Sequence, residues 1–303
     1  MKNYILAAAV MLPAAANAGF YDAPADDKLK LSAQGIAPRL EVALKNNAGS
    51  ILTWRDVNLS GAEFGVEKKN WGLNFWYAMG GGYQSDDDMN ISLNSWSNGK
   101  VDTKYYGFDA WKNLSKYERV DTRWGVRYSR IELDRTGKKS LKATTPPSNQ
   151  LDLNATNHWK DEIVDINTLV AYYGGTFDFY RGNRSKMSLD ASIGAGVLYN
   201  QMDWRNSSGM TGIKIDTYGL GLASMSATLN YEWAFVDTAA LTLAAGIRHE
   251  SLWLGDISRT DINQKALTCP SDPRCGKKDS SGSFIKDFDT NEAFWRIGLK
   301  AMI

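Results

Sequence analysis

Long apolar runs, net charge, cysteine and histidine are all scarce in this 303-residue sequence. Beyond the N-terminus, no stretch holds the 18 or more apolar residues that a membrane-spanning helix needs. Lysine and arginine total 35 and aspartate and glutamate 34, so the charge does not point to nucleic acid or to another strongly charged partner. The motifs of serine hydrolases, zinc peptidases, P-loop proteins and dinucleotide-binding enzymes are absent, and we expect no cofactor.

The two cysteines, Cys269 and Cys275, lie in one short segment, Cys-Pro-Ser-Asp-Pro-Arg-Cys. In a protein exported to an oxidising compartment, such a pair predicts a disulfide that closes a small loop. We expect no metal site there, because no histidine and no second cysteine pair lies nearby.

The N-terminus has the features of an export signal. Lys2 supplies a positive charge, an apolar run follows from Tyr4, and Ala16-Asn17-Ala18 is the small-x-small pattern that signal peptidase accepts. A membrane anchor is the weaker interpretation, because the run is short and a proline interrupts it. We predict that residues 1–18 are a signal peptide and that residues 19–303 form one domain, with 34 charges of each sign once Lys2 is removed.

Apolar and polar residues alternate with a period of two along the rest of the chain. In the last segment, one face of the expected strand holds Trp295, Ile297, Leu299, Ala301 and Ile303. A soluble sandwich and a membrane barrel both give this pattern, but the signal peptide and the 11 Trp, 14 Tyr and 10 Phe favour the barrel. We therefore predict an all-β protein, a transmembrane antiparallel β-barrel surrounded by lipid in a bacterial outer membrane.

The alternation predicts about ten strands. They are expected near residues 28–45, 50–67, 71–84, 103–115, 120–135, 165–180, 186–204, 212–234, 240–257 and 289–303. Tight connections alternate along the chain with longer polar ones, the longest at 136–164 and 258–288. Short periplasmic turns and long external loops are the topology of outer-membrane barrels, and an even number of strands brings both ends of the chain to the periplasmic side.

Four segments are similar to those of a known family of outer-membrane barrels. Ser50-Ile51-Leu52-Thr53-Trp54 looks like the opening of its second strand, and residues 80–89 like the glycine-rich end of its third strand and its acidic second external loop. Residues 117–133 look like its second turn and fifth strand, and residues 293–303 like its closing strand. Through these segments the chain resembles the omptin family, whose members are ten-stranded outer-membrane endopeptidases of the aspartyl type.

The resemblance implies a peptidase site at the outer mouth of the barrel. In the family, a carboxylate pair on the second external loop faces an aspartate and a histidine on the fourth, and together they hold and activate a water. Asp86 and Asp88 stand where the carboxylate pair belongs. The fourth loop, residues 202–210, has one aspartate and no histidine. Of the two histidines in the sequence, His249 falls on the lipid-facing side of the ninth expected strand and His158 in the third external loop.

Each catalytic candidate also has a plainer interpretation. For Asp86 and Asp88 we favour a solvated acidic loop tip, with a calcium site that includes Asn90 as a weaker alternative. We expect His158 to be an ordinary loop residue, and a replacement catalytic base is the alternative.

Charged residues also recur at inward positions of the expected strands. Charges inside a narrow barrel must pair or meet water. We favour a buried ion-pair network over a pore lining, because side chains largely fill barrels near this size. The residues concerned are Arg123, Arg127, Asp190, Glu232, Arg248, Glu250 and Arg296.

The sequence therefore predicts an omptin-like barrel that lacks the catalytic histidine. We expect a monomer without enzymatic activity, whose external loops bind a host, peptide or environmental partner. An endopeptidase that uses Asp86, Asp88 and a displaced base is the first alternative, and a small channel is the second. Lipopolysaccharide phosphates are a further candidate partner for lysines of the third external loop.

Overall fold

The computed structural model of the chain describes residues 28–46, 51–68, 70–85, 99–116, 119–140, 158–206, 211–252, 259–264, 278–279 and 285–303. The segment expected to be the signal peptide, the acidic pair Asp86 and Asp88, and the cysteines Cys269 and Cys275 lie outside these ranges. Within these ranges, no helix is long and apolar enough to cross a membrane.

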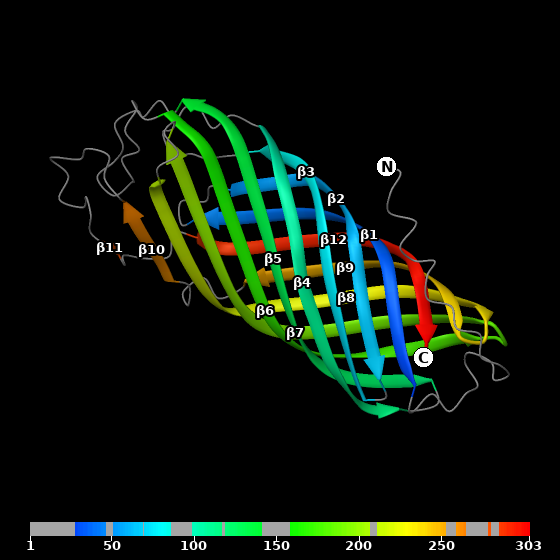
Figure 1. The fold of residues 1–303 in the computed structure, drawn as a ribbon. Helices are drawn as coiled ribbons and strands as arrows, with labels where there is room; N and C mark the ends of the chain where they lie inside the picture. The colour runs from blue at the N-terminus through cyan, green and yellow to red at the C-terminus, as the bar shows by residue number, and fades with distance from the viewer. Residues whose placement is uncertain are drawn as a thin grey trace.

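Long antiparallel strands close into a barrel (Figure 1). The wall consists of β1 (Leu29–Asn46), β2 (Ile51–Lys68), β3 (Trp71–Ser85), β4 (Gly99–Lys116), β5 (Val120–Ser140), β6 (His158–Arg181), β7 (Ser185–Asn206), β8 (Thr211–Val236), β9 (Ala239–Leu252) and β12 (Ile285–Met302). Each strand pairs with the next one in this order, and β12 also pairs with β1, which closes the sheet. The prediction of a ten-stranded antiparallel barrel is confirmed.

Two short strands lie in the connection from β9 to β12, which the sequence predicted as a long loop. β10 (Arg259–Gln264) pairs with residues 213–218 of β8, and β11 (Lys278–Asp279) pairs with β10. β8 has 26 residues and β9 only 14. The part of β8 that reaches beyond β9 therefore has a second partner for its backbone N–H and C=O groups.

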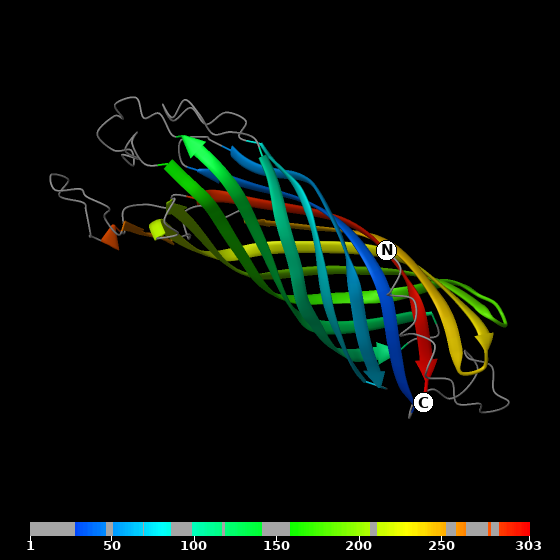
Figure 2. The same ribbon diagram turned by 45° about the horizontal axis from the view of Figure 1, so that its top comes forward.

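The short connections gather at one end of the barrel, here called the turn end. They comprise residues 69–70, 117–119, 182–184 and 237–238. β12 also finishes there, beside the start of β1 (Figure 2), where Leu29 and Ile303 exchange backbone hydrogen bonds of 3.1 and 2.9 Å. The strand ends between which all the other connections run lie at the opposite end of the barrel, here called the outer end. This arrangement confirms the predicted alternation of tight and longer connections.

The outward-facing side chains midway along the strands are apolar, as a lipid-facing band requires. Ile193 is 69% exposed, Ile247 64% and Trp295 58%. The chain neighbours Arg248 and Arg296 line the interior instead. The period-two pattern of the sequence therefore assigned the two faces of these strands correctly.

An apolar cluster of buried residues fills the interior of the outer half of the barrel. Every strand of the wall contributes to this cluster. Trp54 is 1% exposed and Phe288 0%, and both lie near the outer ends of their strands. Side chains thus close the lumen on the outer side.

We predict that Leu133→Ala destabilises the barrel more than Leu229→Ala does. Leu133 belongs to the apolar cluster and is 1% exposed, whereas Leu229 faces outward and is 46% exposed. Leu133→Ala leaves a cavity and should lower the free energy of unfolding by ~2–5 kcal/mol. Lipid can fill the space left by Leu229→Ala, so that loss should be smaller. Denaturant unfolding in lipid vesicles measures both variants, and equal losses would contradict a packed outer lumen.

Candidate functional site

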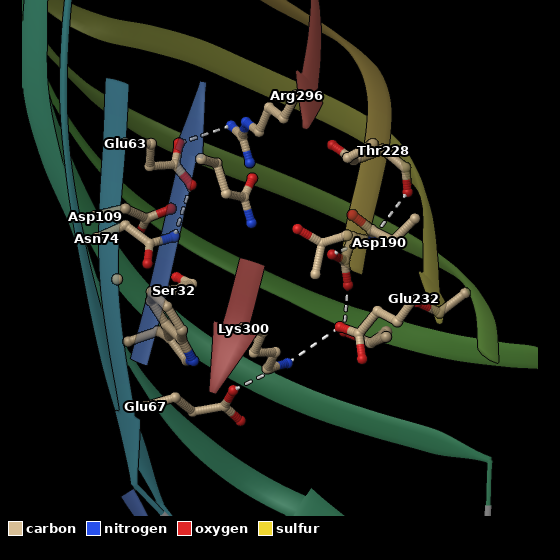
Figure 3. Close-up of a pocket in the computed structure, with 18 of the residues that line it drawn as sticks. Ser32, Glu63, Glu67, Asn74, Asp109, Asp190, Thr228, Glu232, Arg296 and Lys300 are labelled. Atoms are coloured by element: carbon tan, nitrogen blue, oxygen red, sulfur yellow. Dashed lines mark hydrogen bonds and ion pairs between the residues drawn. The ribbon is translucent and has the colours of Figure 1, made fainter. Parts of the chain in front are cut away.

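Below the apolar cluster, the inner half of the lumen holds a polar cavity of about 480 Å³ (Figure 3). Asn70 of the β2–β3 turn and Leu114 near the end of β4 belong to its lining, so the cavity reaches the turn end. It is the main concentration of charged side chains inside the described barrel and therefore the first place to look for chemistry.

Toward the turn end, lysines pair with acidic residues of nearby strands inside the lumen. The Nζ atom of Lys300 on β12 lies 3.1 Å from Glu232 on β8 and 3.9 Å from Glu67 on β2 (Figure 3). Lys30 on β1 lies 3.7 Å from the same Glu67. Lys186 pairs with Asp178 at 2.9 Å. These contacts join strands that are adjacent in the wall or separated by a single strand.

Farther in, Arg296 on β12 lies 3.3 Å from Glu63 on β2, and the Nδ2 of Asn74 donates to the same carboxylate at 3.4 Å (Figure 3). Arg123 on β5 lies 3.8 Å from Asp190 on β7. Glu63 is 4% exposed, so the carboxylate that pairs with Arg296 is shielded from water and depends on its partner for stabilisation.

At the deep end of the cavity, two arginines meet two tyrosines that belong to the apolar cluster. Arg248 lies 3.0 Å from Glu292 and donates to the Tyr105 hydroxyl at 2.8 Å. Tyr105 in turn donates to Glu292 at 3.1 Å. Arg127 lies 3.4 Å from Asp109, and the Tyr172 hydroxyl donates to that carboxylate at 2.6 Å.

The charges of this network balance. The basic residues of the lining are Lys30, Arg123, Arg127, Arg181, Lys186, Arg248, Arg296 and Lys300, and the acidic ones are Glu63, Glu67, Asp109, Asp121, Asp190 and Glu232. Two further acids, Asp178 and Glu292, form ion pairs with members of this set, so the lining residues and their ion-pair partners carry equal numbers of positive and negative charges; the buried Glu250 lies outside this set. A neutral, cross-linked lumen is typical of an interior plug rather than of an ion-selective pore lining.

The predicted luminal network is confirmed for Arg123, Arg127, Asp190, Glu232, Arg248 and Arg296, each of which has an ion pair inside the lumen. Glu250 is buried and accepts a hydrogen bond from Ser224 at 3.4 Å. Sequence reasoning missed Glu63, Asp109 and Glu292 as partners. Successive residues of a strand face opposite sides of the sheet, so the apolar neighbours Phe64, Phe108 and Ala293 on the outer face indicate that these three acids face inward.

The catalytic candidates are not assembled in the described residues. Asp86 and Asp88 lie outside them, and His158 begins β6, where its backbone pairs with Ser140 of β5. The Nδ1 of His249 lies 2.8 Å from Asn291 Oδ1, outside the lumen, as the sequence predicted. No group of three or more potential ligands in this part of the chain is placed to hold a metal ion.

A second polar feature lies on the outside of the barrel near the outer end. It is here called the outer wall and comprises residues 100–106, 128–135, 163–168, 198–203 and 216–218 of β4 to β8. Arg130 lies 3.1 Å from Glu132 and 3.3 Å from Asp165, and Lys104 donates to Glu132 at 3.1 Å. Tyr106 donates to Glu132 at 2.8 Å. The outer wall thus presents polar side chains, paired with one another, where the same strands lower down present apolar ones.

The outer wall explains where the predicted strand bounds were wrong. β5 was expected to end at 135 and β6 to begin at 165, but β5 continues to Ser140 and β6 starts at His158. Both faces of such a segment can carry polar side chains once it leaves the lipid, so the alternation on which the prediction depended fades there.

Comparison with known proteins bears on the fold alone. Neither a scan against protein-family models nor a search of curated proteins found a match. Among solved structures, the outer membrane protease OmpT from Escherichia coli matches with a TM-score of 0.61 and 11% identity, over 92% of this chain and 97% of that one. The translocator domain of the autotransporter NalP from Neisseria meningitidis matches with a TM-score of 0.41 and 12% identity, over 90% of this chain and 88% of that one.

The fold is that of a bacterial outer-membrane barrel. The closed sheet, the outward apolar band and this likeness together place the chain in the bacterial outer membrane. At 11% identity, the likeness to OmpT says nothing about activity.

We predict that the pair of Glu63 and Arg296 is strongly coupled. Arg296→Met leaves a buried carboxylate without its cation and should cost ~3–5 kcal/mol of unfolding free energy. The double variant with Glu63→Gln should recover much of that loss. Denaturant unfolding of the two single variants and the double variant gives the coupling energy.

The matched control is Lys104→Met on the outer wall, because Lys104 is 58% exposed and pairs with Glu132 at 3.1 Å. Exposed pairs contribute ~0–1 kcal/mol, so this variant should stay close to wild type. If the losses of unfolding free energy in the two single variants simply add up in the double variant, then water, and not the partner residue, solvates the Glu63 carboxylate and the Arg296 guanidinium.

Proposed function

We propose that this chain is a plugged, non-conducting outer-membrane barrel that acts at the cell surface by binding a partner through its outer end. The observation that carries the proposal is the outer wall. The outward side chains of β5 to β8 change from apolar, as at Trp124 and Tyr173, to polar and mutually bonded, as at Arg130 and Asp165. This change supports a wall that projects beyond the lipid and carries the external connections.

The closed lumen argues against a channel. The apolar cluster fills the outer half of the lumen, and paired charges line the inner half. Water and ions need a continuous polar path, and an apolar constriction of packed side chains excludes one.

The sequence argues against a peptidase of the omptin type. The family's fourth-loop histidine has no counterpart in residues 202–210, and His249 is bonded to Asn291 outside the lumen. His158 stays the one remaining histidine, at the outer end of β6. An endopeptidase with Asp86, Asp88 and His158 is therefore kept as the second candidate function, since the fold is shared with a protease.

The same wall suggests where lipopolysaccharide would make contact. Tyr106 and Tyr128 lie where the apolar band gives way to the outer wall, and Arg130 and Lys104 lie directly above them. Aromatic rings are enriched at this level of membrane proteins, and cationic side chains beside them can meet lipid phosphates. We propose that the chain is monomeric there and binds lipopolysaccharide through this belt.

We predict that the purified barrel does not conduct in planar lipid bilayers. The expected result is no stable current step at any applied voltage, because the apolar cluster blocks the lumen. A variant with Trp54→Ala and Phe288→Ala removes two of the largest side chains of the apolar cluster. It is the positive control, because opening the lumen should give a current that the assay can detect. Reproducible steps from the wild type would favour the channel.

We predict that cells displaying the chain adhere to immobilised extracellular-matrix protein, and that replacing residues 141–157 with a glycine–serine linker abolishes adhesion without changing barrel assembly. Heat-modifiable migration on a gel monitors assembly. The same cells should not cleave fluorogenic peptides with paired basic residues. Cleavage that disappears in Asp86→Ala or His158→Ala would overturn the binding proposal and favour the endopeptidase.

A further inference from the structure

The deep end of the luminal cavity contains buried N–H groups that the ion pairs leave unused. Arg127 Nε and Nη1, Arg248 Nε and Trp76 Nε1 have no hydrogen-bond partner among the described residues. Arg127 is 6% exposed and Trp76 8%, and all three residues line the cavity. Buried N–H groups almost always have an acceptor, so this cluster calls for one.

These groups belong to one neighbourhood. The Arg248 guanidinium carbon lies 5.8 Å from the centre of the Trp76 ring, and the Trp76 and Tyr105 rings are 5.9 Å apart. Trp76 also extends from β3 across Gly107 of β4, toward β5 where Arg127 is placed, since a Cβ on Gly107 would come within 2.6 Å of the indole. The described ion pairs occupy other atoms of each guanidinium: Nη2 of Arg127 and Nη1 of Arg248.

The chemistry of the unused atoms specifies the ligand. All four are N–H donors, and none of them is an acceptor. A guanidinium presents its N–H groups as a planar fork that matches a carboxylate or phosphate. An oxyanion brings several acceptor oxygens and no hydrogens, whereas each water would bring two hydrogens that need acceptors of their own.

Access is possible from one side. The apolar cluster closes the lumen toward the outer end, and the cavity extends to the turn end, which is the periplasmic end in outer-membrane barrels. A volume of about 480 Å³ would hold roughly sixteen waters at their share of liquid volume and is ample for a small anion. Because the charges of the network balance, the local donors rather than a net field would select the ligand.

We propose that the deep end of the lumen, around Trp76, Arg127 and Arg248, is a binding site for a small oxyanion group, a phosphate or a carboxylate, that enters from the turn end. This site does not depend on what the outer end binds. Its failure would leave the proposed surface function untouched.

The test uses the full mature barrel in micelles, with inorganic phosphate, acetate and sodium chloride titrated at constant ionic strength. The indole N–H resonance of Trp76, assigned by its absence in Trp76→Phe, is followed by NMR, and affinity by calorimetry. We expect a saturable shift with phosphate or acetate and none with chloride; the two oxyanions together show which chemistry is preferred. Loss of one N–H to a charged acceptor should weaken binding roughly tenfold in Trp76→Phe and in Arg127→Gln.

The matched control is Trp295→Phe, which makes the same change at a residue 58% exposed on the outside and should bind like wild type. Where Arg127→Gln fails to fold, Trp76→Phe decides, because it removes one N–H donor and no charge. The proposal is overturned if folded wild type gives no saturable response, or if these variants bind as tightly as wild type.

Discussion

Pairing of β1 with β12 is the contact on which the other features of this protein depend. In lipid there is no water to satisfy a free strand edge, so a sheet can cross only when its first and last strands meet. The ladder runs without interruption from Lys30 opposite Met302 to Lys45 opposite Asp287. Once it is closed, every strand has one face toward lipid and one toward a narrow interior. The interior must then be filled by whatever the inward positions carry.

This chain fills its interior in two different ways, and the division follows depth. Near the outer end the inward positions are apolar and pack as the core of a soluble protein does, around Trp54 and Phe288. Nearer the turn end they are charged and are neutralised pairwise. The boundary is a layer of aromatic rings that lie across glycines of neighbouring strands: a Cβ on Gly125 would come within 2.5 Å of the Tyr172 ring. Small residues at such positions let large ones lie flat, so the layer separates the polar cavity from the apolar cluster without a gap between strands.

The sequence predicted the barrel, its strand number, the alternation of connections and the inward charges, because period-two patterning directly reflects the two environments of a strand in lipid. The prediction of the strand bounds failed where the outward face of a strand no longer meets lipid. The outer parts of β5 and β6 leave the lipid, and the polar residues Arg130, Glu132 and Asp165 then occupy outward positions. The sequence also predicted the arginines of the lumen but not all of their partners. For Glu63 and Arg296 the reason is that closure of the barrel brings β2 and β12, from opposite ends of the chain, to the two sides of β1. The predicted catalytic residues stay predictions, since Asp86 and Asp88 are outside the described chain.

The two halves of the lumen also separate the two functional proposals. A plug at the outer side means that nothing bound at the cell surface can reach the charged cavity, and that a solute in the cavity cannot cross to the outside. A buried network of this kind is costly to desolvate, and apolar residues of similar size would often stabilise a core as well or better. The outer half of this same barrel demonstrates that its strands can support such an apolar filling. Stability alone therefore does not account for charges in the inner half, and unused N–H groups on Arg127 and Arg248 are what a site kept for a ligand, rather than for packing, would show.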